Sequence, residues 1–497
     1  MTATFNGNKI DVFNPRNNKH IESLSITSES ICLNYLNRLS ESQSSWENLS
    51  IKKRISTINR FRKNIVKNLD QFINYIELET GKKRDEATLE MFVALEHIKQ
   101  CSKIAKKTLK PQFRNAGVLK FLLKKGYVCY EPYGLAAIIS PSNYPLILTL
   151  SPLVEALLAG NSVILKPSEH TPLTAKLLKK IWDTTSNHKN IFEVVYGDGN
   201  IANQIIESPL TRIVCFTGST AVGKKIALQC AQTLKPVILE LGGKDPMVVM
   251  SDANIGRAVD AAIWGGFANA GQTCIGVKRV FVHNSQFDVF KTLIINKTTA
   301  MKSGPHQDNE VGPITIQSTY DNVINQLNQI EDSNCIHQGT IDTNEGTYIP
   351  PTIIENPDLN YDVHNYETFG PVINLYSFSD YDDLKNKLHE IEYALSGSIF
   401  GKNKTEINKV IKLIDAGAIS INDVQTSFGM YNLPFGGNQL SGIGRMHGRE
   451  GLRSFSKIKS ITNNRITFQS ELWWYGQRKG IDKLLRKFLK IFYSLII

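Results

Sequence analysis

Between Tyr133 and Gly243 the sequence alternates between short, β-branched apolar runs and segments with helical spacing, and this alternation limits the fold more than any other feature. Because the runs are apolar at consecutive positions, both faces of the strands that they form are expected to be buried. Strands of this kind that alternate with helices predict a parallel sheet covered by helices on both faces. The ligands of such sheets bind beyond the carboxyl ends of the strands.

The same reasoning assigns elements along the rest of the chain. The first block is predicted to contain strands at 136–139, 163–165, 192–196, 212–216 and 237–239 and helices at 146–158, 171–182 and 219–233. A second α/β block from about Asn254 has predicted helices at 255–268, 287–301, 381–391 and 405–414, a strand at 279–282 and a loop at 358–369. Residues 45–108 have helical periodicity, and residues 119–130 predict a hairpin arm outside the alternating pattern.

Composition excludes several classes of protein. With 497 residues, of which 41% are hydrophobic and 21% charged, the chain can bury a large core and is not expected to be disordered. The net charge is +11, but the basic residues of the main body are not gathered in one aromatic-interleaved stretch, so we expect no nucleic-acid partner. No uncharged run of about 18 apolar residues exists, so no membrane-spanning helix is expected.

The cysteines indicate a reducing compartment. They form an odd, widely spaced set without a C-x-x-C pair, which argues against a disulfide framework and a structural zinc site, and we expect no metal. The N-terminal residues lack the apolar stretch of a secretory signal, so we expect a cytoplasmic protein. The seven cysteines are Cys32, Cys101, Cys129, Cys215, Cys230, Cys274 and Cys335.

Cys274 is the candidate nucleophile. It ends the run Phe267-Ala-Asn-Ala-Gly-Gln-Thr-Cys274, whose polar and glycine residues suit a tightly turned loop better than a core. A nucleophilic cysteine needs surroundings that lower its pKa, because the thiolate attacks a carbonyl far better than the thiol does. The alternative is a buried structural cysteine.

Glu240 is the candidate base, thirty-four positions before Cys274. It ends a strongly apolar strand in the run Leu239-Glu-Leu-Gly-Gly-Lys244, where a carboxylate is unfavourable unless it is functional or paired. Burial at the carboxyl end of the strand would raise its pKa toward the range of a general base. The alternative is a glutamate that caps a neighbouring helix. Together, a thiol and a carboxylate can form and then hydrolyse a thioester.

These two motifs, with six others in the same order, closely resemble the NAD(P)-dependent aldehyde dehydrogenase superfamily, and the resemblance extends from about Val12 to about Thr462. The other segments are Pro141-Ser-Asn-Tyr-Pro145, Leu165-Lys-Pro-Ser-Glu169, Phe216-Thr-Gly-Ser-Thr-Ala-Val-Gly223, Glu367-Thr-Phe-Gly-Pro371, Pro434-Phe-Gly-Gly437 and Ser441-Gly-Ile-Gly-Arg445.

The resemblance implies roles for three catalytic residues. Cys274 matches the nucleophile that attacks the aldehyde, and Glu240 matches the base that activates water to hydrolyse the thioester. Asn143 matches the side-chain amide that forms an oxyanion hole with the backbone N–H of Cys274. Such a donor lowers the barrier by about 3 kcal/mol. Taken alone, Asn143 also fits an Asx-turn between two prolines.

The resemblance also implies an NAD site, with NADP as the alternative cofactor. Lys166 and Glu169 match residues that hold the adenosine ribose, and a carboxylate at Glu169 would repel the 2'-phosphate of NADP. From the residues alone, Lys-Pro-Ser-Glu also fits a helix start capped by Ser168, and the Gly218–Gly223 turn also fits simple turn chemistry. The remaining matches are Gly218, Ser219 and Gly223 for the pyrophosphate, Glu367 for the nicotinamide ribose and Phe369 for the nicotinamide ring.

Two positions receive separate interpretations. The residue before Asn143 is commonly Trp in this family and is Ser142 here, which affects the packing of that loop on its cofactor side. His447 is interpreted as a surface or interface residue without a role.

The last thirty residues extend beyond the family resemblance. Apolar residues recur there at helical spacing opposite basic ones, after the cluster Trp473-Trp-Tyr475. Such a helix is typical of attachment to an anionic membrane surface, and the alternative is packing on a partner subunit. The apolar set is Ile481, Leu484, Leu485, Phe488, Phe492, Leu495 and Ile496, and the basic set is Arg478, Lys479, Lys483, Arg486, Lys487 and Lys490.

The implied fold is α/β and aldehyde dehydrogenase-like, with a Rossmann-type cofactor domain, an α/β catalytic domain and a β-hairpin oligomerisation arm that builds a homodimer or homotetramer. The expected reaction is NAD-dependent oxidation of an aldehyde, preferably lipophilic or fatty, to a carboxylic acid. Alternatives are a semialdehyde dehydrogenase with a small soluble substrate and a non-catalytic scaffold on a degenerate fold. The predicted boundaries are 1–112 and 133–242 for the NAD-binding domain, 113–132 and 454–465 for the arm, 243–453 for the catalytic domain and 466–497 for the tail.

Overall fold

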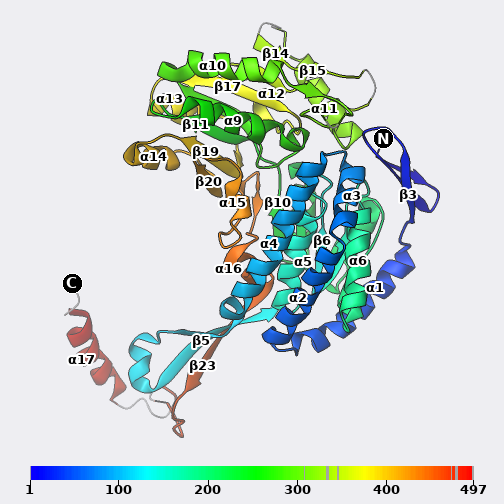
Figure 1. The fold of residues 1–497 in the computed structure, drawn as a ribbon. Coiled ribbons are helices and arrows are strands. Elements are labelled where there is room, and N and C mark those ends of the chain that lie inside the picture. The colour runs from blue at the N-terminus through cyan, green and yellow to red at the C-terminus, as the bar shows by residue number, and fades with distance from the viewer. Residues whose placement is uncertain are drawn as a thin grey trace. The chain divides into compact units, whose positions relative to one another are not determined.

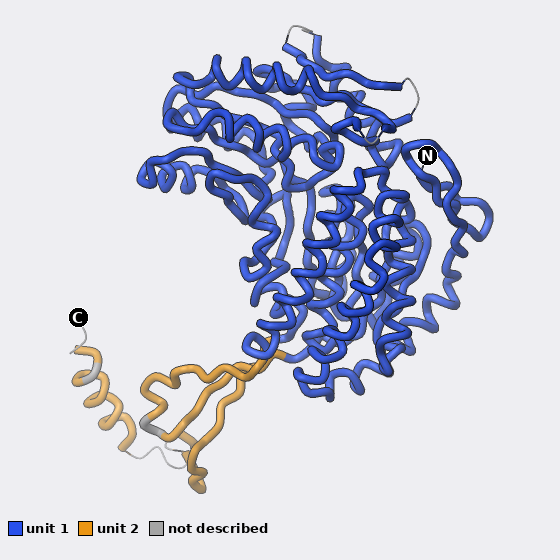
Figure 2. The backbone as a smooth tube through the Cα atoms, viewed as in Figure 1, with its two compact units in different colours: residues 1–109, 131–457 blue, residues 110–130, 458–497 orange. Residues whose placement is uncertain are grey.

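The computed structural model describes residues 2–306, 308–331, 335–343, 346–471, 473–475 and 480–494. It divides into two compact units, which Figure 2 colours separately. The first comprises residues 1–109 and 131–457, and the second comprises residues 110–130 and 458–497. The predicted domain boundaries within the first unit stay a prediction. Of the predicted tail residues, Arg478, Lys479, Leu495 and Ile496 and the side chain of Phe492 lie outside the described part.

A six-stranded sheet forms the predicted alternating block (Figure 1). Its strands run parallel except β22, which pairs antiparallel with β10 at the edge. In sheet order the strands are β22 (Gly442–Ile443), β10 (Val237–Glu240), β9 (Thr211–Thr217), β6 (Leu135–Ile139), β7 (Ser162–Lys166) and β8 (Phe192–Val194).

Both faces of this sheet are buried, as the apolar runs predict. Alternate residues of β6 enter two different cores: Ala136 and Ile138 pack in one, and Ala137 and Ile139 pack in the other. One core is built with α2 (Ile51–Lys67), α3 (Leu69–Thr80), α4 (Arg84–Leu109), α5 (Ile147–Ala159) and α6 (Leu173–Thr185). The other is built with α1 (Glu29–Glu47), α7 (Gly199–Glu207) and α8 (Thr220–Ala231).

The second sheet has seven strands and follows the same rule (Figure 1). Met247 and Val249 of β11 pack in one core, and Val248 packs in the core on the opposite face. The first core includes residues of α9 (Ile255–Phe267), α10 (Asn284–Thr299) and α11 (Gln317–Asn328), and the second those of α13 (Tyr381–Leu388) and α14 (Lys404–Ile411). In sheet order the strands are β14 (Ile336–Gln338), β16 (Thr352–Glu355), β17 (Val372–Phe378), β12 (Val277–His283), β11 (Asp245–Val249), β19 (Ser396–Phe400) and β20 (Ala418–Ile421).

Shorter elements complete the first unit. β1 (Ala3–Asn6), β2 (Lys9–Phe13) and β3 (His20–Ser25) form a separate sheet, β13 (Lys302–Ser303) pairs with β15 (Thr340–Ile341), and β18 (Tyr393–Ala394) pairs with β21 (Asn438–Gln439). The short helices are η2 (Lys189–Ile191), η3 (Ala268–Gly271), α12 (Asp362–Asn365), α15 (Thr426–Gly429) and α16 (Gly448–Ser454). α12 falls inside the segment predicted to be a loop.

The second unit contains the predicted arm and the tail helix. β4 (Gln112–Arg114) pairs antiparallel with β5 (Lys124–Pro132) around η1 (Gly117–Leu122), and β23 (Ser456–Asn464) lies on the other side of β5. The tail forms the amphipathic helix α17 (Ile481–Ser494). Among the described helices, none combines the length and the apolar character needed to cross a bilayer.

Two local interpretations were wrong. Ser168 does not cap α6, because that helix begins at Leu173 and its first N–H groups donate to the buried carboxylate of Glu79. His447, interpreted as a surface or interface residue, is fully buried where the chain enters α16.

Candidate active site

The loop that carries Cys274 is held in a strained conformation. Asn269 and Ala270 both have φ of 55°, in the left-handed region that side chains other than glycine seldom adopt. Outside contacts hold it: the N–H of Asn269 donates to Glu86 Oε1 at 2.6 Å, and Lys278 Nζ donates to the carbonyl oxygen of Gly271 at 2.6 Å. The strain therefore lies four residues before the candidate nucleophile.

Cys274 itself is partly exposed, so the alternative of a buried structural cysteine is not supported. It packs against the apolar cluster of Ile275, Leu395 and Phe435, beside Phe428. Burial, together with the carboxyl groups of Glu367, Asp245 and Glu240, raises the pKa of the thiol. We expected surroundings that lower this pKa, so the protein alone holds Cys274 as a thiol.

Glu240 lies at the carboxyl end of β10 and is 4% exposed. Neither carboxylate oxygen has a hydrogen-bond partner among the described residues, so the helix-cap alternative is wrong. Burial raises the pKa of Glu240 well above its usual value, and Arg445 opposes this shift. A Cβ at Gly436 would lie 2.8 Å from Glu240 Oε1, so the absence of a side chain there makes room for the carboxylate.

The strand of Glu240 leads directly to the Cys274 loop. A Cβ at Gly243 would lie 2.2 Å from the carbonyl oxygen of Cys274. Only glycine permits this approach, since Cβ contacts below 3.0 Å are essentially never found. The glycines that follow Glu240 in the sequence thus bring the candidate base and the candidate nucleophile to the same place.

Asn143 is buried beside the same loop. Its Nδ2 donates to the carbonyl oxygen of Gln272 at 2.9 Å, two residues before Cys274. Its Oδ1 accepts no hydrogen bond from any described residue, so the Asx-turn alternative is wrong. An amide nitrogen has two N–H groups, so the contact with Gln272 leaves one for another acceptor. The carbonyl oxygen of Asn143 accepts from Lys82 Nζ at 2.8 Å and from Asn269 Nδ2 at 3.1 Å.

The predicted ribose residues meet beyond the carboxyl end of β7. Lys166 Nζ pairs with Glu169 Oε2 at 2.8 Å, so each charge already has a partner without a ligand. Burial raises the pKa of Glu169, but the attraction of Lys166 outweighs it and the net shift is downward. Glu169 is therefore a carboxylate that can accept hydrogen bonds.

The predicted pyrophosphate residues begin α8. Ser219 caps the helix, and its Oγ accepts from the N–H of Val222 at 3.4 Å. A Cβ at Gly218 would lie 2.4 Å from the ring of Phe216, and one at Gly223 would lie 2.4 Å from Leu241. Close packing therefore requires glycine at both positions, beyond what a turn alone would require. The free N–H groups of a helix start attract an anion.

Glu367 contacts the glycines that follow Glu240 at the end of β10. Its Oε1 accepts from the N–H of Gly243 at 3.2 Å, and a Cβ at Gly242 would lie 2.3 Å from its Oε2. Burial raises the pKa of Glu367 to about 7. Phe369 is half-buried two residues further on. No role of these two residues is visible without a cofactor, so their assignment stays a prediction.

Sequence reasoning missed the residues that hold the site in place. Lys82 and Glu90 form a fully buried ion pair of 2.8 Å, and Glu90 Oε1 also accepts from the N–H of Leu146 at 2.8 Å. Tyr144 Oη lies 2.8 Å from Thr273 Oγ1, next to the nucleophile. The sequence signal for these residues was weak. Glu86 and Glu90 are four positions apart and so share one face of α4, but carboxylates at this spacing also occur on ordinary solvated helix faces.

Comparisons with known proteins agree with this arrangement. The model of the aldehyde dehydrogenase family matches residues 3–461. A 4,4'-diapolycopene aldehyde oxidase from a Methylomonas species is 32% identical over 454 residues, which cover 90% of this chain and 84% of the relative. A putative NADP-dependent succinate-semialdehyde dehydrogenase from Mycolicibacterium smegmatis is 29% identical, over 85% of this chain and 83% of its own.

A solved structure extends the likeness to three dimensions. Betaine aldehyde dehydrogenase from Staphylococcus aureus, crystallised with NAD+, superposes with a TM-score of 0.87 at 26% identity and covers 94% of this chain and 96% of its own. The predicted aldehyde dehydrogenase-like α/β fold is confirmed. A family match over nearly the whole chain, together with a catalytic-type thiol and carboxylate at one loop, means that this enzyme belongs to the aldehyde dehydrogenase family.

Proposed function

We propose that the protein oxidises an aldehyde to its carboxylic acid, with Cys274 as nucleophile, Asn143 as oxyanion donor and Glu240 as base. The observation that carries this proposal is the convergence of all three at one loop: Asn143 donates to Gln272 of that loop, and Gly243, three residues after Glu240, closely approaches Cys274. The family supports it, because it acts on aldehydes by nicotinamide-linked oxidation.

The residues divide the reaction into two halves. Cys274 Sγ attacks the aldehyde carbon, and the oxygen that becomes negative accepts from the backbone N–H of Cys274 and from the second N–H of Asn143. A nicotinamide dinucleotide held by Glu169, Ser219 and Glu367 would supply the hydride acceptor, and Cys274 would then carry the acyl group as a thioester. Glu240 then takes a proton from water, the hydroxide attacks the thioester, and the acid leaves as the thiol reforms. The net change is aldehyde, water and NAD+ to acid, NADH and a proton.

NAD is the cofactor that the chain's own residues favour. Glu169 would accept a hydrogen bond from the 2'-hydroxyl of the ribose and repel a 2'-phosphate, and the downward shift of its pKa keeps it charged. The partner Lys166 offsets part of that repulsion, so NADP is the alternative. We expect wild type to have a higher kcat/KM with NAD than with NADP. In Glu169→Gln the difference between the two cofactors should be smaller.

The substrate that we propose is a lipophilic aldehyde. Cys274 packs against an apolar cluster that contains Phe435, and the aromatic side chain of Phe428 packs against the same cluster. The Methylomonas relative is named for an aldehyde of diapolycopene, a hydrocarbon. A small semialdehyde is the second candidate, because the mycobacterial relative is named for succinate semialdehyde.

The deciding experiment measures NADH production from aldehydes of increasing chain length and from succinic semialdehyde. We expect kcat/KM to rise with chain length and no turnover in Cys274→Ala. A preference for succinic semialdehyde would contradict the proposed substrate class but not the assignment as an aldehyde dehydrogenase. Equal rates for wild type and Cys274→Ala on every substrate would overturn the catalytic assignment, and no turnover of any aldehyde by wild type would favour a non-catalytic scaffold.

The second unit suggests where the enzyme works. In α17 the apolar side chains Leu484, Leu485 and Leu489 are exposed. Four basic residues, Lys483, Arg486, Lys487 and Lys490, lie on the same helix. We propose that this face attaches the protein to an anionic membrane surface, in the cytoplasm, because a sequence without a C-x-x-C pair suits a reducing compartment. We also propose a homodimer or homotetramer built by β5 and β23, the arm strands.

A further inference from the structure

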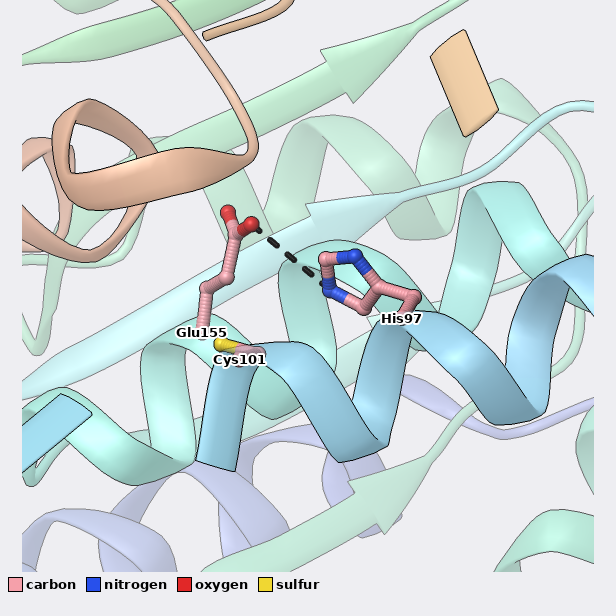
Figure 3. A group of neighbouring side chains, drawn as sticks. All are labelled: His97, Cys101 and Glu155. Carbon is pink, nitrogen blue, oxygen red and sulfur yellow. Dashed lines mark ion pairs between the residues drawn. The ribbon is translucent and has the colours of Figure 1, made fainter. Parts of the chain in front are cut away.

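A second group of reactive side chains lies outside the proposed catalytic machinery. His97 and Cys101 are one turn apart on α4, Glu155 is on α5, and His447 immediately precedes α16. Figure 3 shows the first three side chains pointing toward one another. Their exposed fractions are 1% for His97, 3% for Cys101 and 0% for Glu155 and His447. None of the four has a task in aldehyde oxidation.

The geometry of the group is that of a set of ligands. One donor atom from each of His97, Cys101 and Glu155 lies within 4.8 Å of the others, and His97 Nε2 lies 3.6 Å from Glu155 Oε1. Bonds to a tetrahedral zinc ion are about 2.0–2.3 Å long, so its ligand atoms are about 3.3–3.8 Å apart. Side-chain rotations that move the atoms by about 1 Å would reach that spacing.

The donor atoms also lack other partners. Both ring nitrogens of His447, Oε2 of Glu155 and one ring nitrogen of His97 have no hydrogen-bond partner among the described residues, while the other nitrogen of His97 faces the backbone carbonyl of Ser151. The other oxygen, Oε1, accepts from the N–H of His447 at 2.9 Å. Each unsatisfied buried polar group destabilises a fold by about 1–3 kcal/mol, and native proteins contain few of them. A group of four such atoms in one place therefore indicates a missing partner.

His97, Glu155 and His447 are also poor choices for an apolar core. The rings of His97 and His447 have centroids 4.8 Å apart, with Tyr431 beside both. Neutral imidazole is the form that binds a metal, and a bound cation favours the charged carboxylate and thiolate.

We propose that His97, Cys101 and Glu155 bind a zinc ion, with His447 next to the fourth position. Imidazole, thiolate and carboxylate are the zinc ligands of proteins, and a site without access to solvent is structural. The expectation of no metal rested on the cysteine spacing, whereas the three ligands of this site come from two helices, α4 and α5. No C-x-x-C spacing marks a site of this kind.

The position of the site suggests what the ion stabilises. α4 also carries Glu86 and Glu90, which hold the Cys274 loop and the Asn143 loop. Met446, directly before His447, forms an isolated antiparallel β-bridge with Phe435. Phe435 belongs to the apolar cluster against which Cys274 packs. An ion at the group would thus join three elements that support the active site.

The first test measures zinc in the purified full-length protein after dialysis, by mass spectrometry. We expect about one zinc per chain in wild type and a loss of zinc in Cys101→Ser and His97→Gln. Cys215→Ser is the matched control, because Cys215 is buried in the same core but does not belong to the group of ligand atoms. It should keep the zinc, and so should Cys274→Ser. Zinc no higher than in a buffer blank, or equal zinc in wild type and Cys101→Ser, would overturn the proposal.

Cobalt supplies a second readout that does not depend on activity. Wild-type protein reconstituted with Co²⁺ should show the near-ultraviolet absorption of a cobalt–thiolate bond, and Cys274→Ser and Cys215→Ser should keep it. If Cys101→Ser does not fold, as judged by circular dichroism, this spectrum decides the question. Absence of the band in wild type would refute thiolate ligation, and its loss in Cys274→Ser would move the ion to the nucleophile.

Discussion

At the scale of single residues, the burial of Glu240 separates the two halves of the reaction. Its oxygens have no partner, so replacing it with glutamine removes the base without breaking a hydrogen bond. In Glu240→Gln we expect thioester formation to survive and hydrolysis to slow by about 10²–10⁴-fold. Rapid mixing with NAD and aldehyde should then give a burst of about one NADH per active site, followed by slow turnover. If the variant shows no burst, Glu240 is also necessary for thioester formation.

The pKa shifts predict how the rate depends on pH. Glu240 acts when deprotonated, and burial raises its pKa well above the usual value, so the base is inactive at acid pH. The pKa of Cys274 is raised as well, so the thiolate fraction also grows as the pH rises. We expect kcat to increase from acid through neutral to alkaline pH, as followed by NADH production. A profile that is level from pH 5 upward would show that neither group titrates as described.

The candidate residues could be predicted because their chemistry is local. A thiol in a glycine-containing loop and a carboxylate at the end of an apolar strand, Cys274 and Glu240, are unusual in any sequence. The pKa of Cys274 could not be predicted, since three carboxyl groups from distant segments lie near it. His447 was misjudged for the same reason: its burial depends on α4 and α5, which its neighbours in the sequence do not indicate.

At the scale of elements, the turn from β10 to β11 sets the distance between base and nucleophile. In Gly243→Ala the new methyl group would meet the carbonyl oxygen of Cys274 at 2.2 Å, which forces the nucleophile loop to move. Displacement of about 1 Å at a reacting atom can slow catalysis by about 10²-fold. We therefore expect at least that loss in kcat, with a lower melting temperature.

Gly256→Ala is the control for this variant. Gly256 is in α9, and a Cβ there would meet only Asn254 Oδ1 at 3.8 Å. Alanine at a helical position stabilises by about 0.5–1 kcal/mol relative to glycine, so the melting temperature should stay level or rise. Similar kinetics for Gly243→Ala and Gly256→Ala would mean that the close approach at Gly243 does not control the nucleophile.

Strands that are buried on both faces were largely predictable from the sequence. The five predicted strands of the first block correspond to β6–β10, because consecutive apolar residues have few alternatives to a covered parallel strand. The edge strand β22 could not be predicted: it has two residues, and its pairing with β10 joins positions about two hundred residues apart. The start of α6 was missed because its cap, Glu79, comes from another helix.

At the scale of the whole molecule, the chain carries a helix that the family match does not cover, since the match ends at residue 461. α17 exposes large apolar side chains, among them Leu484 at 60% and Leu489 at 52%. Isolated exposed apolar residues are ordinary, but a continuous stripe on one helix indicates a surface that binds something. Basic residues beside the stripe favour anionic lipid over a second protein surface, because each adds about 1 kcal/mol near such a membrane.

Deletion of residues 476–497 tests this directly, and it keeps the contacts of Lys124 with Glu471 and Trp473 in the second unit. We expect the truncated protein to oxidise short soluble aldehydes at the wild-type rate but to lose sedimentation with phosphatidylglycerol vesicles. A full-length variant with Lys483, Lys487 and Lys490 changed to Gln should bind those vesicles less, while neutral phosphatidylcholine vesicles bind neither form well. Undiminished binding after the deletion would refute the membrane proposal, and a change in oligomer size would favour a partner subunit as the surface that α17 contacts.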